Sequence, residues 1–123
     1  KEFISALIAV EESNVDNACV EFDVSGHYKD ALAGPLWEPL NPDSLENLDL
    51  QPIETKSGDV VLFNSYVPHA SDGNGSLDRR CNIYITYNKE TDGDHRRQYF
   101  NEKRLSFPPN NERDLNKDYS FKV

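Results

Sequence analysis

Residues 58–87 constrain the fold of this chain most, because they read in order as turn, strand, histidine, polar loop, arginine and strand. Residues 57–59 have turn chemistry, and the apolar residues 60–63 form the short, β-branched and aromatic run that a buried strand requires. His69 follows where that strand ends. The loop 71–76 is rich in Gly, Asn, Asp and Ser, which favour turn dihedrals and local hydrogen bonds. We therefore expect the chain to reverse direction after His69.

Strand character resumes over residues 81–87, where side chains should alternate between two faces. A hairpin of the two strands would bring His69 close to Arg79 or Arg80. Hydrophobicity predicts that the odd-numbered residues point inward, and this is the face of Arg79. The odd-numbered apolar residues are Ile83, Ile85 and Tyr87.

This arrangement resembles the phytanoyl-CoA dioxygenase family of Fe(II)/2-oxoglutarate oxygenases. In that family a strand opening with Gly-Asp leads to an iron-binding histidine, and an arginine eleven residues later binds the far carboxylate of 2-oxoglutarate. Here Gly58 and Asp59 precede His69, and Arg80 lies eleven positions beyond it. Ser71 matches the hydroxyl residue that the family often uses on the same carboxylate. The resemblance implies that His69 is a metal ligand and that Arg80 and Ser71 bind the co-substrate.

The resemblance covers nearly the whole chain, from about Phe3 onward. Residues 15–27 resemble a segment that is typical of the family, with Ala18 where Gly is usual and Val24 where Pro is usual. Those two differences affect turns and leave the ligands untouched. Residues 93–109 are most similar to the branch that contains 2-aminoethylphosphonate dioxygenase-type members.

One departure concerns the metal site, which in this family is a facial triad of two histidines and one carboxylate. Its first two ligands form a His-x-Asp/Glu pair, but no carboxylate lies two positions after His27, His69 or His95. In the family this pair precedes the strand to which residues 3–10 correspond. We therefore expect residues 1–123 to be one domain, the C-terminal part of a larger oxygenase, which supplies a single iron ligand.

The implied chemistry suits these residue types. Neutral imidazole is a good Fe(II) ligand, and a guanidinium stays charged and offers a planar fork of donors to a carboxylate. Family spacing favours Arg80, whereas strand alternation favours Arg79, and a bulge at the strand start would reconcile the two. The resemblance implies decarboxylation of 2-oxoglutarate to succinate, coupled to hydroxylation of a small-molecule substrate.

Two other hypotheses remain open. The chain could be a non-catalytic β-barrel binding or interaction domain that has lost its iron site. It could also be a cupin with another metal chemistry, which predicts a His-x-His pair that this sequence lacks. The resemblance implies that His27 braces a loop and does not bind metal. Trp37 is expected to pack against the core or to contact substrate.

Composition limits the partners. A net charge of −9 and a pI near 4.7 argue against nucleic acid and membrane surfaces, which would repel the chain. No apolar run approaches the roughly 20 residues of a membrane span. Cys19 and Cys81 are too few for a disulfide framework, so we expect reduced thiols and the cytoplasm. A basic cluster suits an anionic substrate such as a phosphonate, although solvation of a helix surface explains it more simply; it comprises Arg96, Arg97, Lys103 and Arg104.

The expected fold class is all-β, part of a double-stranded β-helix of the jelly-roll and cupin type. A short C-terminal helix should run from Asp94, its cap, to about Arg104, with Tyr99 and Phe100 supplying its apolar contact. The strands are expected at residues 3–10, 19–22, 50–55, 60–63 and 81–87.

Overall fold

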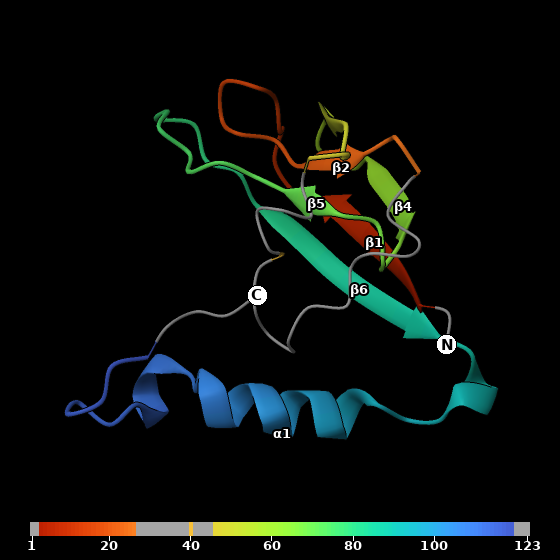
Figure 1. The fold of residues 1–123 in the computed structure, drawn as a ribbon. Coiled ribbons are helices and arrows are strands. Elements are labelled where there is room, and N and C mark those ends of the chain that lie inside the picture. The colour runs from red at the N-terminus through yellow and green to blue at the C-terminus, as the bar shows by residue number, and fades with distance from the viewer. Residues whose placement is uncertain (1–2, 27–39, 41–45, 120–123) are drawn as a thin grey trace.

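The computed structural model describes residues 3–26, 40 and 46–119, so His27 and Trp37 lie outside the described residues. The described part contains two antiparallel sheets of three strands each, followed by one α-helix (Figure 1). This confirms the prediction of an all-β, jelly-roll-type fold with a short C-terminal helix. The first sheet has the order β4-β1-β6, from β1 (Phe3–Ala9), β4 (Val60–Asn64) and β6 (Asn82–Asn88). The second has the order β3-β2-β5, from β2 (Glu21–Asp23), β3 (Leu50–Pro52) and β5 (His69–Ala70).

The turn before β4 explains how that strand is aligned with β1. Gly58 has φ of 93°, a left-handed conformation that L side chains rarely adopt, and its N–H donates to the carbonyl of Ala9 at 2.8 Å. The Asp59 carboxylate closes the turn by accepting the Lys56 N–H at 2.8 Å. The Gly-Asp pair therefore starts β4 in register with β1, with Ile8 opposite Val60.

The expected hairpin between the strands on either side of His69 is wrong. β4 and β6 do not pair with each other, because both pair with β1 between them. After β4 the chain crosses to the second sheet, where β5 pairs with β2. The crossing follows a turn at residues 65–67 and then Pro68, whose nitrogen cannot donate a ladder hydrogen bond.

The side of β6 that faces the second sheet is also the opposite of the one expected from hydrophobicity, although no residue of β6 is buried. Leu7, which is 2% exposed, lies opposite both Val61 and Tyr84 in the first sheet. The even-numbered residues of β6 therefore face the second sheet, and the odd-numbered ones face away from it. Between the sheets lies a core of Leu7, Val20 and Phe22, against which Ile53, Val61, Phe63 and Val67 pack.

The outer face of the first sheet is apolar and largely uncovered by the described residues. Leu62 is 70% exposed and Ile4 is 54% exposed. This outer face comprises Ile4, Val60, Leu62, Ile83, Ile85 and Tyr87. Hydrophobicity could not identify the core-facing side of β6 because both sides of this sheet carry apolar residues.

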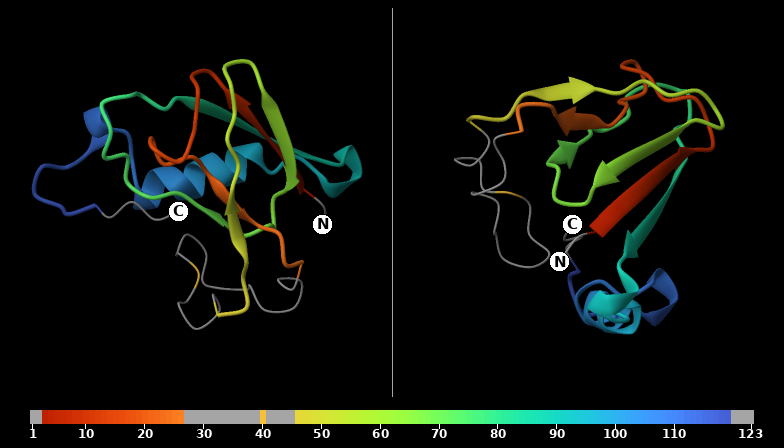
Figure 2. Two further views of the ribbon diagram at one scale, coloured as in Figure 1. Left: turned by 90° about the horizontal axis from the view of Figure 1, so that it is seen from above. Right: turned by 90° about the vertical axis from the view of Figure 1, so that its right-hand side faces the viewer.

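Helix α1 (Arg96–Ser106) begins one residue later than expected, with His95 rather than Asp94 as its N-cap. The Asp94 carboxylate still accepts the Arg96 N–H at 3.0 Å. Tyr99 and Phe100, which were expected to supply its apolar contact, are 43% and 54% exposed, and α1 buries none of its own residues. Figure 1 and the right-hand view of Figure 2 show α1 lying apart from the two sheets, beyond the end of β6. No helix in the described ranges has the length and apolar character needed to cross a membrane.

Candidate functional site

His69 is exposed, and its ring contacts one residue of each sheet. In β5 it pairs with Phe22 of β2, and its ring stacks on the Phe22 ring with 5.6 Å between centroids. Its edge contact with Phe63 of β4, at 5.3 Å, adds a neighbour from the first sheet. These two aromatic rings fix the plane of the imidazole.

The protonation pattern of His69 is set by the backbone. Its Nδ1 lies 2.8 Å from the Val67 carbonyl oxygen, which can only accept a hydrogen bond. In neutral His69 the proton is therefore on Nδ1 and the lone pair is on Nε2. A histidine held in this way has the ligand geometry common in metalloproteins, where one ring nitrogen binds the metal and the other donates to a carbonyl.

The strand that carries His69 is anchored by Asp23. Its backbone N–H donates to the carbonyl of Pro68 at 2.9 Å, one residue before His69. Burial acts to raise the pKa of the Asp23 carboxyl, but hydrogen bonds from the Asp49 N–H, the Ser25 hydroxyl and the Ser25 N–H outweigh it and lower the pKa. Asp23 is thus ionised, and its carboxylate accepts hydrogen bonds that hold the chain next to His69 in place.

Arg80 and Ser71 lie together, as the resemblance implied. Arg80 Nη2 donates to Ser71 Oγ at 3.1 Å across the loop that joins β5 to β6. Arg80 Nη1 is shielded from solvent and has no hydrogen-bond partner among the described residues. A buried guanidinium nitrogen without a partner is costly unless an acceptor binds it. The pair therefore offers a donor fork with one position available to a carboxylate.

Arg79 has a different environment. Its side chain is 83% exposed and its Nε lies 3.7 Å from Glu11 Oε1, a surface ion pair of the kind that contributes little. Arg80, two residues before Asn82, shares the alternation of the even-numbered residues. The inner face of β6 is the even-numbered one, so strand alternation carried back from Asn82 favours Arg80 over Arg79.

The positive charge of Arg80 also affects the pKa values of two further side chains. Burial raises the pKa of the Cys19 thiol, with added repulsion from Glu54 and Glu21, while Arg80 acts to lower it. Burial likewise raises the pKa of the Tyr84 hydroxyl, and Arg80 again acts in the opposite direction. Both cysteines are free thiols, with Cys19 buried and Cys81 half-buried.

A row of polar residues on the inner face of β6 was not expected from the sequence. It comprises Asn82, Tyr84 and Thr86, at positions expected to face outward. The Thr86 hydroxyl lies 2.8 Å from the Ser5 hydroxyl, which in turn lies 2.8 Å from that of Ser65. The sequence shows the alternation of polar and apolar residues along β6. Which of the two sets faces inward depends on the position of the second sheet.

A metal ion would need ligands from outside the described residues. Within residues 3–26, 40 and 46–119 no three His, Cys, Asp or Glu side chains converge on one point. His69 Nε2 has the chemistry of an Fe(II) ligand, and Arg80 with Ser71 suits one carboxylate of 2-oxoglutarate. The donor set therefore fits both groups but accounts for a single protein ligand to the metal.

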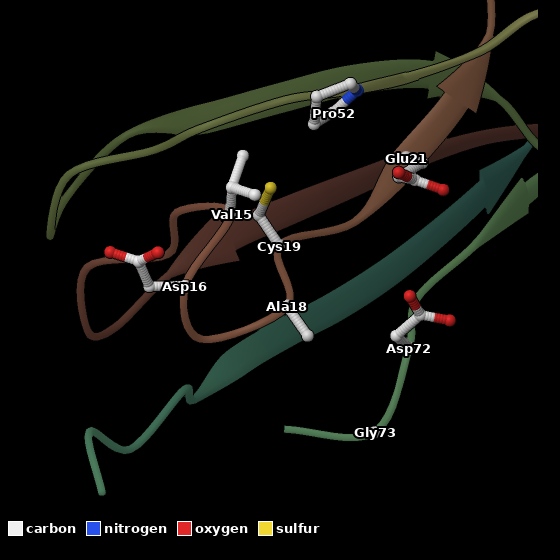
Figure 3. Close-up of a pocket in the computed structure, with 8 residues that line it drawn as sticks. All are labelled: Val15, Asp16, Ala18, Cys19, Glu21, Pro52, Asp72 and Gly73. Atoms are coloured by element: carbon white, nitrogen blue, oxygen red, sulfur yellow. The ribbon is translucent and has the colours of Figure 1, made fainter. Parts of the chain in front are cut away.

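A cavity of about 220 Å³ lies against the loop that follows Ser71. His69, Ser71 and Arg80 are not among its described lining residues. Figure 3 shows its carboxylates, on Asp16, Glu21 and Asp72, spread around the cavity rather than converging. The lining comprises Val15, Asp16, Ala18, Cys19, Glu21, Pro52, Asp72 and Gly73.

Three relatives of known name are similar to this chain. A 2-aminoethylphosphonate dioxygenase from uncultured bacterium HF130_AEPn_1 is 39% identical over 98% of this chain and 46% of the relative. A methylphosphonate hydroxylase from Gimesia maris is 32% identical over 87% of this chain and 41% of the relative. The dioxygenase lolE1 of Epichloe uncinata is 31% identical over 89% of this chain and 43% of the relative.

The chain thus spans less than half the length of these relatives. The family model for phytanoyl-CoA dioxygenase (PhyH) matches residues 1–81, a range that includes His69, Ser71 and Arg80. Since this match covers more than half of the 123 residues, the chain belongs to the phytanoyl-CoA dioxygenase family.

Proposed function

We propose that this chain is the C-terminal part of an Fe(II)- and 2-oxoglutarate-dependent dioxygenase that hydroxylates a small-molecule substrate and converts 2-oxoglutarate to succinate. One observation carries the proposal: Arg80, whose buried Nη1 has no described partner, donates through Nη2 to Ser71, two residues after His69, whose Nε2 carries the lone pair. A metal ligand and a carboxylate anchor on adjoining segments are what this reaction requires. The dioxygenase names of the relatives support the same chemistry.

Each residue has a defined task in this proposal. His69 would bind Fe(II) through Nε2, with the Val67 carbonyl and the rings of Phe22 and Phe63 holding the imidazole in place. Arg80 would bind the far carboxylate of 2-oxoglutarate, and Ser71 would hold the guanidinium in position. Bound iron would supply the activation of dioxygen.

The remaining metal ligands would come from the rest of the enzyme. The relatives are more than twice as long as the matched segments, which cover 46%, 41% and 43% of them. β5 and β6 each form an edge of their sheet, and an edge strand has unpaired N–H and C=O groups that readily accept another strand. Strands from an upstream part would pair there and carry a His-x-Asp or His-x-Glu pair to His69. The same part would cover the outer face of the first sheet.

For the substrate we propose a small organophosphonate, because two of the relatives are named for phosphonates. The basic residues of α1 could assist by attracting an anion. Several of them are already engaged, however: Arg104 pairs with Glu112, and Arg96 lies over the Phe100 ring. Nucleic acid and membranes are not part of the proposal, and the two free thiols suit the cytoplasm.

The test is succinate formation from 2-oxoglutarate after anaerobic loading with Fe(II) and admission of air. It compares this chain with the protein extended upstream to include a His-x-Asp or His-x-Glu pair. We expect turnover in the extended protein, none in the shorter chain, and loss of turnover in extended His69→Ala and Arg80→Ala. Arg79→Ala is the matched control and should keep its activity. An extended protein that neither binds Fe(II) nor consumes 2-oxoglutarate would instead support a non-catalytic binding domain.

A further inference from the structure

Asp23, the last residue of β2, is bonded to the chain on both sides of that strand. Its backbone N–H donates to the carbonyl of Pro68 at 2.9 Å, on the side of β5 and His69. Its carboxylate serves the other side, where Oδ1 accepts the Asp49 N–H at 2.8 Å, directly before β3. One residue therefore ties both flanking strands of the second sheet to β2.

The carboxylate of Asp23 is buried and occupied by local donors. Asp23 is 6% exposed, and Ser25 donates its N–H to Oδ1 at 3.2 Å and its hydroxyl to Oδ2 at 2.9 Å. The Val24 N–H donates in turn to the Asp49 carbonyl at 2.9 Å. The chain leaving β2 and the chain entering β3 are thus bonded in both directions. Without the carboxylate, two N–H groups and one hydroxyl lose their acceptor, which favours a rearranged backbone.

The imidazole of His69 depends on the segments that Asp23 joins. Among the described residues its ring contacts the Val67 carbonyl through Nδ1 at 2.8 Å, and the rings of Phe22 and Phe63. Phe22 precedes Asp23 in β2, and the segment of Val67 is bonded to Asp23 through its next carbonyl. A shift of β2 against this segment would turn the imidazole away from the Val67 carbonyl. It would also move Nε2, the atom proposed to bind Fe(II).

We propose that Asp23 is a positioning residue for His69: its carboxylate fixes the end of β2 against β3, and the fixed strand in turn holds the imidazole and its Nε2 in place. This rests on the proposed function and adds to it a residue that affects the metal only through His69. The carboxylate oxygens accept hydrogen bonds from Ser25 and Asp49, so Asp23 acts through the backbone and not as a ligand. Replacing a residue that orients a metal ligand typically lowers metal affinity or activity by about 10-fold to 100-fold.

The first measurement needs no metal. Nitrogen chemical shifts of isotope-labelled histidine, recorded on the metal-free extended protein at about pH 8.5, show which ring nitrogen carries the proton. The signals that disappear in His69→Gln belong to His69. We expect protonated Nδ1 in the wild type and a mixture of both tautomers in Asp23→Ala, because the bond to the Val67 carbonyl is then weakened. Asp23→Asn keeps an oxygen for the Asp49 and Ser25 N–H groups and should keep the wild-type pattern.

The second measurement is the dissociation constant for Fe(II) of the extended protein, found under anaerobic conditions by competition with a chelator of known affinity. We expect a rise of at least about 10-fold in Asp23→Ala, and recovery of most of the lost affinity in Asp23→Asn. If Asp23→Ala does not fold, Ser25→Ala decides: it removes only the bond to Oδ2 and should raise the constant about threefold.

Asn17→Ala is the matched control. Asn17 is 2% exposed, and its amide accepts the Asn14 N–H at 2.8 Å and donates to the Glu12 carbonyl at 2.9 Å, so its removal also breaks a buried polar network. None of these bonds involves β2 or β5. Asn17→Ala should lower stability in urea titration but leave the His69 tautomer and the Fe(II) constant unchanged.

The outcomes separate positioning from plain stability. A less stable Asp23→Ala with an unchanged tautomer and an unchanged Fe(II) constant would overturn the inference. Equal weakening of Fe(II) binding in Asn17→Ala would also overturn it, because affinity would then follow stability alone. Failure of the wild-type extended protein to bind Fe(II) would refute the proposed function itself, whereas the inference fails alone when the wild type and Asp23→Ala bind Fe(II) equally well.

Discussion

The Arg80–Ser71 pair allows a graded prediction of 2-oxoglutarate affinity. Replacing Arg80 by Lys keeps the positive charge but removes the planar fork, so one donor can no longer serve Ser71 while another serves the ligand. A hydrogen bond to a charged group contributes about 1.5–3 kcal/mol. Since 1.4 kcal/mol corresponds to a factor of ten, the dissociation constant should rise about 10-fold to 100-fold.

Ser71→Ala should have a smaller effect. It removes the 3.1 Å bond from Arg80 Nη2 but leaves the guanidinium and its charge in place. The expected loss of about 0.5–1.5 kcal/mol corresponds to a rise in the dissociation constant of roughly 2-fold to 10-fold. Arg79→Ala, at a side chain that is 83% exposed, should change it by less than about twofold.

The measurement is calorimetric titration of 2-oxoglutarate into the extended protein loaded with Fe(II) under anaerobic conditions. Thermal melts of the three variants should show that all of them fold. The reasoning fails if Arg79→Ala weakens binding as much as Arg80→Lys does. It also fails if Arg80→Lys leaves the affinity unchanged, because the unpartnered nitrogen would then have no role in binding.

Three further predictions concern stability and reactivity. Leu7→Ala, at a side chain that is 2% exposed, should lower the free energy of unfolding measured by urea titration by about 2–5 kcal/mol. Leu62→Ala, at a side chain that is 70% exposed, should lower it by less than about 1 kcal/mol, and equal losses would contradict the assigned faces. The folded-state pKa of Asp23 lies below its unfolded value of about 3.9, so its contribution to stability is present above that pH and is lost as pH falls through the folded pKa. Asp23→Asn should therefore flatten the fall in urea midpoint between about pH 5 and pH 2, and an unchanged slope would refute the assignment. Buried Cys19, whose pKa is raised, should react with a thiol reagent more slowly than Cys81 at pH 8, as followed by mass spectrometry of the labelled peptides.

Local chemistry was enough to predict several elements closely. Turn residues and β-branched runs placed β1, β4 and β6 within one or two residues of their observed ends. The Gly58 turn fixes the start of β4 through its own backbone conformation, a property of glycine that needs no distant partner. Shorter strands were less predictable, and β3 ends at Pro52 rather than at Thr55, which forms an isolated bridge with Ser13.

The sequence also brought His69, Ser71 and Arg80 together as candidates, through a spacing shared with a family. Hydrophobicity favoured the face of Arg79 and the family spacing favoured Arg80, and the sequence could not resolve this because both faces of β6 carry residues that a core can accept. The prediction of a hairpin was wrong for a related reason. Local turn chemistry predicts that the chain reverses but does not predict which strand it then pairs with.

By itself, then, the sequence determined the identity of the chemical groups, the family and the strand character of β1, β4 and β6, all of which depend on residue type and local spacing. The tertiary structure alone decided that β1 separates β4 from β6, that the even-numbered side of β6 faces the second sheet, and that Arg80 Nη1 has no described partner. These are properties of how two sheets pack. A side chain's alternation is fixed by its own strand, but its burial is fixed by what packs against that strand.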